Sequence, residues 1–244
     1  MESRKFSHGG VWTTRSATVN HVFTRAVILP ATPLLVPGAA GAADPLRDVR
    51  LAACAALAGL AASGPPMVLA PGPHGFRGPA VLRPTFAAAG IADAALPADV
   101  TAPWAVEREL AGTASSVLLF CLGMALGEDA ARVPVLEIPA TAAVVGRESP
   151  QRAAGDDAEP GSRAASLHAA AGVVGRHLAG GGTLVAAAGG TPGPAAVAPA
   201  DPGAPHPGIA ELLALAAPGL TAATRPFPQE HDHLPAEYAL ATLG

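Results

Sequence analysis

Two short apolar runs enclose a helical stretch near the start of the chain, and this arrangement limits the fold more than any other feature. The runs "RAVIL" (25–29) and "PMVLA" (66–70) predict buried strands. Between them, Asp44 followed by a proline predicts the start of a helix that runs to about Ala62. Strand, helix and strand fit within about 45 residues, which suits a right-handed βαβ unit with parallel strands.

Later parts of the chain repeat this pattern. Apolar runs predict strands at 133–139 and 182–188, and a helix is expected over 162–178. The most polar interior stretch, 146–162, is interpreted as an exposed loop, and the Gly, Pro and Ala-rich stretch 189–207 as a linker. The predicted fold class is therefore α/β, with a mainly parallel central sheet flanked by helices.

One domain is the expected organisation. A chain of 244 residues that is 50% hydrophobic can bury one sizeable core. Residues 1–22 lack apolar periodicity and are interpreted as a disordered leader, and 23–222 form the predicted α/β domain. Residues 223–244 are interpreted as a C-terminal extension that would add an edge strand.

Composition narrows the classes of partner. Charged residues make up 14% of the chain and the formal net charge is -4, which favours neither nucleic acid nor an anionic membrane surface. A small-molecule ligand or a protein partner, including a second copy of the chain, is the expected class. No uninterrupted apolar run approaches the roughly 18 residues of a membrane helix.

The cysteines and the early apolar stretch favour a cytoplasmic protein. Cys54 and Cys121 each lie within an apolar run, as small buried residues do in a reducing compartment. They offer neither a disulfide framework nor a cysteine zinc site. Residues 25–43 imitate a secretory signal, but three prolines interrupt the apolar stretch and a long polar segment precedes it.

Ligands of open parallel sheets bind beyond the carboxyl ends of the strands, so the loops after the first two strands are the places to look for chemistry. These loops are "PATPLLVPG" (30–38) and "PGPHGFRG" (71–78). The second holds His74 on a stiff Gly/Pro turn, where it is either an ordinary loop histidine or a functional group.

The pair "AVILPATPLLVPG" and "MVLAPGPHG" resembles the start of the class III extradiol ring-cleavage dioxygenase B-subunit family (LigB-like). In that family, two strands end in proline-rich turns that each present a histidine. The matching positions are Pro30, Pro33, Leu34 and Pro37 in the first turn and Pro73, His74 and Gly75 in the second. Ala31 stands where the first histidine belongs.

The resemblance implies a non-haem Fe(II) held by the two histidines and a C-terminal glutamate, with open positions for a catechol and dioxygen. Alanine at position 31 offers no lone pair, so the resemblance implies a divergent member without the standard triad. Glu211 is the nearest candidate for the carboxylate. The turn that carries the family's acid/base histidine is replaced by Gly189, Gly190 and Thr191.

Three hypotheses remain at this stage. The first is a divergent, dioxygenase-like protein that acts on or binds a small ligand near His74, or that serves as a non-catalytic protein partner. The second is an active metal-dependent dioxygenase with a rebuilt ligand set, in which His74 is combined with Glu211 or with an alternative cluster in "QEHDH". That cluster contains Glu230, His231, Asp232 and His233, which could equally be an exposed polar tail. The third is a non-catalytic structural or interaction protein.

Overall fold

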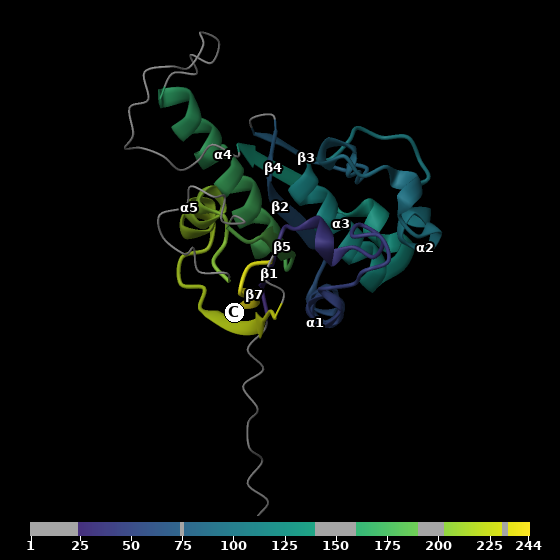
Figure 1. The fold of residues 1–244 in the computed structure, drawn as a ribbon. Helices are drawn as coiled ribbons and strands as arrows, with labels where there is room; N and C mark the ends of the chain where they lie inside the picture. Colours follow the sequence, from purple (N-terminus) through teal and green to yellow (C-terminus); the bar gives the residue numbers. More distant parts are fainter. Residues whose placement is uncertain (1–23, 74–75, 140–159, 190–202, 231–233) are drawn as a thin grey trace, which may run out of the picture.

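The computed structural model of the chain describes residues 24–73, 76–139, 160–189, 203–230 and 234–244 (Figure 1). The strands are β1 (Ala26–Leu29), β2 (Pro66–Gly72), β3 (Arg77–Ala80), β4 (Val135–Pro139), β5 (Thr183–Ala187), β6 (Ala222–Pro228) and β7 (Glu237–Leu243). The α-helices are α1 (Arg47–Ser63), α2 (Ala98–Thr101), α3 (Thr113–Leu126), α4 (Pro160–Ala179) and α5 (Pro207–Ala216).

The strands form one seven-stranded mixed sheet in the order β3-β4-β2-β5-β1-β7-β6. The four central strands are parallel, as expected, whereas β3 pairs with β4, β7 with β1 and β6 with β7 in antiparallel fashion. The prediction of a mainly parallel sheet therefore holds for the centre and is wrong for both edges. The links before β3 and between β6 and β7 are too short for the crossover that a parallel neighbour requires.

Helices cover both faces of the sheet, with α1 and α3 on one face and α4 and α5 on the other (Figure 1). The handedness of the crossovers accounts for this division. From β1 to β2 and from β2 to β4 the chain moves toward one edge, and from β4 to β5 it moves back. Right-handed crossovers in opposite directions place their helices on opposite faces.

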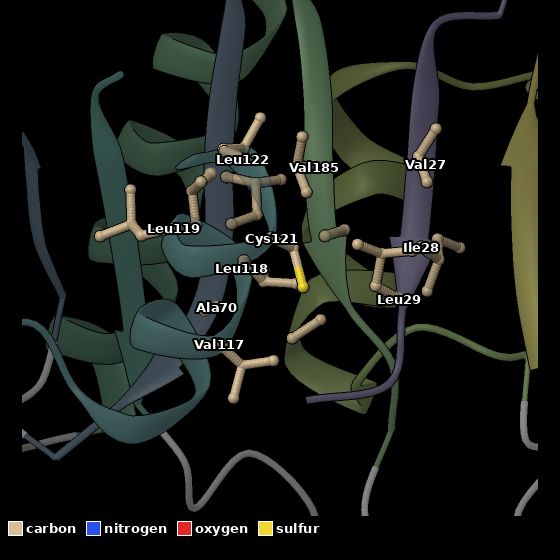
Figure 2. Close-up of a cluster of buried hydrophobic side chains, with 14 of the residues drawn as sticks. Val27, Ile28, Leu29, Ala70, Val117, Leu118, Leu119, Cys121, Leu122 and Val185 are labelled. Atoms are coloured by element: carbon tan, nitrogen blue, oxygen red, sulfur yellow. The ribbon is translucent and has the colours of Figure 1, made fainter. Parts of the chain in front are cut away.

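Helix α3 lies in the core: Val117–Leu122 are all buried, between β2 and β5 on one side and α1 and the 3-10 helix Gly127–Arg132 on the other, and Figure 2 shows several of these side chains beside the strands. Thr113–Arg132 is the one stretch in the described part of the chain with the length and apolar character of a membrane span, and half of it is buried inside the fold. Cys121 is buried and Cys54 half-buried, and burial raises the pKa of both thiols.

Helix α1 ends where predicted but begins later. The structure has Leu46 at the capping position, without a side-chain cap, and Asp44 lies before it. The Asp44 carboxylate instead accepts two hydrogen bonds from the Arg50 guanidinium, one of them 2.6 Å long. This bidentate bond holds the pKa of Asp44 below its usual value. The predicted capping residue therefore fastens the loop to the first turn by its side chain.

Strand β6 forms one edge of the sheet, and the backbone nitrogens of its two prolines point away from the neighbouring strand β7. Thr221 and Gly244 exchange both backbone hydrogen bonds, and the register continues from there to Pro228 opposite Glu237. Because such pairs alternate in antiparallel strands, Pro226 and Pro228 occupy positions whose backbone nitrogens point away from β7. A proline there removes a donor that a further strand would use.

We expect the double substitution P226V/P228V to make the protein self-associate, because it restores outward-facing donors on β6 without disturbing the pairing with β7. Sedimentation velocity over a range of concentrations measures the effect. Thr224→Val is the control, since it changes a side chain on the same strand and leaves the backbone donors as they are. A sedimentation coefficient equal to that of the wild type would contradict the blocking role of the prolines.

Candidate functional site

The carboxyl ends of the four parallel strands meet at one edge of the sheet, hereafter the carboxyl edge. Ala31 follows β1 there, Pro73 follows β2, Pro139 ends β4, and Gly189 follows β5. The structure therefore brings together the loops that the sequence analysis selected, although they are separated by as many as 158 positions between Ala31 and Gly189.

The proline-rich turn after β1 folds into a short 3-10 helix, Pro33–Leu35, capped by the Thr32 hydroxyl. Ala31 is half-buried and packs against the core. Its methyl group offers no lone pair to a cation, so this turn supplies packing at the position where the resemblance implies a histidine ligand. His74 lies outside the described residues, between Pro73 and Phe76.

Glu211, the candidate carboxylate, projects from α5 at the carboxyl edge. It lines a small cavity of about 10 Å³, hereafter the Glu211 cavity, together with Phe76, Ile138, Pro139, Arg163, Leu167 and Gly208. That volume has room for about one water molecule. Phe76, two positions after His74 in the sequence, therefore lies at the same cavity as Glu211.

His206 also lies at this edge, and the sequence analysis did not select it. Its backbone N–H donates to the carbonyl of Ala187 at 3.0 Å, at the end of β5, and its Nδ1 accepts from the N–H of Gly208 at 3.3 Å. The ring is thus the cap of α5. The only local signal was a histidine before proline at a helix start. Because Nδ1 accepts a hydrogen bond, this atom is not available as a metal ligand.

Glu137, in the middle of β4, is fully buried at 0% exposure and forms the centre of a polar cluster. Its Oε1 accepts from the Gly112 N–H and from the Ser115 hydroxyl, both at 2.7 Å. Its Oε2 lies 3.2 Å from Nη2 of Arg77, which is its partner across the β3–β4 pair. The signal in the sequence was a charged residue inside the apolar run "VPVLEIP".

Two glycines make room for this carboxylate. A Cβ on Gly72 would lie 2.7 Å from Glu137 Oε2, and a Cβ on Gly112 would lie 3.1 Å from Oε1 and 2.9 Å from the Pro73 ring. Gly112 also caps α3, so the carboxylate lies at the helix N-terminus, where the helix dipole favours a negative charge. The cluster therefore joins β2, β3, β4 and α3 beside the turn after β2.

The alternative cluster lies at the link between β6 and β7. Glu230 is exposed there, and His231 and His233 lie outside the described residues. Three strands separate β6 from β2, the strand that precedes His74. At about 4.8 Å per strand, β2 and β6 are roughly 19 Å apart. Metal–ligand bonds of about 2 Å make an ion shared between these two strands unfavourable.

Across 24–73, 76–139, 160–189, 203–230 and 234–244, no three His, Cys, Asp or Glu side chains lie close enough together to hold a metal ion. At the carboxyl edge, Ala31 lacks a donor and Nδ1 of His206 is engaged. The donor set of the described residues therefore does not fit the Fe(II) triad that the family resemblance implies.

Comparison of the chain with protein-family models, with curated proteins and with solved structures finds no match in any of the three.

Proposed function

We propose that the chain is a divergent LigB-like protein that binds a small ligand at the carboxyl edge and lacks the standard iron triad. The proposal is supported by the proline framework of the turn after β1, with Ala31 at the ligand position, and by the α/β topology that gathers the strand ends. The observation that carries the binding function is the position of Glu211 beside apolar walls at that edge.

The Glu211 cavity offers two kinds of interaction to a ligand. Phe76, Ile138 and Leu167 provide apolar surface, and the exposed Glu211 carboxylate accepts hydrogen bonds. Such a combination favours a small aromatic or aliphatic molecule that carries hydroxyl donors. The cavity is the size of one water molecule, so binding requires the ligand to displace side chains at the mouth.

Metal analysis and catechol titration of freshly purified protein test this proposal. We expect well below one iron, zinc or manganese per chain, and catechol binding that Glu211→Gln weakens about tenfold, which corresponds to about 1.4 kcal/mol. Glu230→Gln is the matched control, because it neutralises an exposed glutamate near the other edge of the sheet. Equal catechol affinity in wild type and Glu211→Gln would contradict the proposed site.

The second candidate is an active metal-dependent ring-cleavage dioxygenase with a rebuilt ligand set. It is favoured by one observation, namely that Phe76, two positions after His74, shares a cavity with Glu211. This candidate predicts one metal ion per chain and oxygen uptake with catechol that disappears in His74→Ala. If the protein neither binds catechol nor takes up oxygen with it, the remaining hypothesis is a non-catalytic structural or interaction protein.

A further inference from the structure

We propose that Glu137 is a positioning residue for the Glu211 cavity and that it acts through Arg77 on Phe76. Its functional meaning rests on the proposed ligand-binding function, whereas the positioning itself can be measured without any ligand. Three sets of contacts carry the inference. They are the contacts that fix the carboxylate, those that fix the guanidinium, and those at the two ends of the link between β2 and β3.

The carboxylate is held from the side of α3. The Gly112 N–H and the Ser115 hydroxyl both donate to Oε1 at 2.7 Å, and the side chain has no exposed surface. Both donors belong to the first turn of a helix whose following residues are buried in the core. The carboxylate is therefore a fixed point of the fold.

The guanidinium is held against this fixed point. Nη2 of Arg77 lies 3.2 Å from Glu137 Oε2 and donates to the Leu110 carbonyl at 2.8 Å, and Nη1 donates to Glu109 at 2.7 Å. Nε of Arg77 and Oε2 of Glu137 are buried without a hydrogen-bond partner among the described residues. The ion pair is consequently the one polar contact between β3 and that carboxylate oxygen.

The same carboxylate touches both described ends of the link between β2 and β3. At the first end, Gly72 approaches so closely that a Cβ would be 2.7 Å from Oε2. At the second end, Arg77 directly follows Phe76, which lines the Glu211 cavity. Glu137 and the Glu211 cavity lie on opposite faces of β4, since the neighbouring residue Ile138 lines the cavity.

The net stability that a buried ion pair contributes is small, because desolvation offsets much of the attraction. The ion pair of Glu137 and Arg77 is therefore assigned a role in the placement of Phe76. A shift of the Arg77 backbone moves the adjacent Phe76, and a displaced Phe76 changes the wall of the Glu211 cavity. Glu137 reaches the cavity through this route without touching a ligand.

The experiment compares Glu137→Gln with Ser116→Ala by NMR of the phenylalanine rings. Gln keeps the shape and an acceptor for Gly112, but its amide places a donor against Arg77. We expect the Phe76 ring signals to move while those of Phe86 and Phe120, a packed core pair 5.1 Å apart, stay in place. Ser116→Ala removes a neighbouring buried hydroxyl that contacts Thr85 and Ala111 instead, and should leave Phe76 unchanged.

Unmoved Phe76 signals in folded Glu137→Gln would overturn the proposal, and so would equal movement in Ser116→Ala. If Glu137→Gln does not fold, Arg77→Lys is the deciding variant, because it keeps the positive charge and removes the planar guanidinium that contacts Glu137. Phe76 should then move in Arg77→Lys, and an unchanged signal overturns the proposal. Failure of catechol binding in the wild type, with Phe76 moving as expected, would contradict only the proposed function.

Discussion

Gly64→Ala is expected to lower the free energy of unfolding by about 3 kcal/mol or more. A Cβ at position 64 would lie 2.0 Å from the carbonyl oxygen of Gly181. That oxygen belongs to backbone, which cannot rotate away as a side chain can. The backbone of Gly64 is extended, with φ 163°, so the penalty comes from the lack of space and not from the conformation. The contact joins the link after α1 to the link after α4.

Guanidinium unfolding of Gly64→Ala and Gly59→Ala measures this effect. Gly59 lies on the exposed side of α1, and no atom lies within 4 Å of a Cβ built there. Alanine at that position should stabilise the protein by about 0.5–1 kcal/mol, because glycine is a poor helix former. If Gly64→Ala and Gly59→Ala had the same midpoint of unfolding in guanidinium, the contact between Gly64 and Gly181 would be too easily relieved to support this prediction.

Glu137→Leu is expected to cost about 3–5 kcal/mol, because it removes one partner of a buried ion pair. Leucine fills a similar volume, but it leaves the Gly112 N–H and the Ser115 hydroxyl without their acceptor and the Arg77 guanidinium without its buried counter-charge. Unpaired polar groups in the interior carry most of this cost. The measurement is again the unfolding free energy in denaturant.

The matched control is Glu109→Gln, which removes the other carboxylate that contacts Arg77. The Glu109 side chain is 65% exposed, so its ion pair is screened by solvent and the change should stay within about 1 kcal/mol. A loss in Glu137→Leu no larger than that in Glu109→Gln would mean that the buried cluster relaxes or admits water.

Much of the central fold could be predicted from the sequence. The strands "RAVIL" and "PMVLA", the end of α1 near Ser63 and the α/β class follow from local apolar runs and Gly/Pro stops, which act over a few neighbouring residues. The pairing and direction of the strands at the edges could not be predicted in the same way. Whether β7 adds beside β1 depends on which side of the sheet the chain reaches, and local pattern carries no such information.

For the candidate site, the sequence pointed to the loops after β1 and β2 and to Glu211, but it did not predict what surrounds them. His206 lies in the stretch whose composition predicts a linker, and it caps α5 because that helix begins at the end of β5. Glu137 is a single charged residue in an apolar run, a pattern that does not show whether the side chain is buried or which residues it contacts. The roles of both depend on strand order, because their partners lie in segments far away along the chain.

The sequence by itself determined the central strands β1, β2, β4 and β5, the end of α1, and the prolines that surround Ala31 in the turn after β1. Those features depend on periodicity and on the fixed φ of proline, which are local properties. Only the tertiary structure decided that Glu137 is buried against Arg77 and that Glu211 shares a cavity with Phe76. Such contacts arise when crossovers bring distant segments together, and their energies depend on burial, which a linear sequence does not contain.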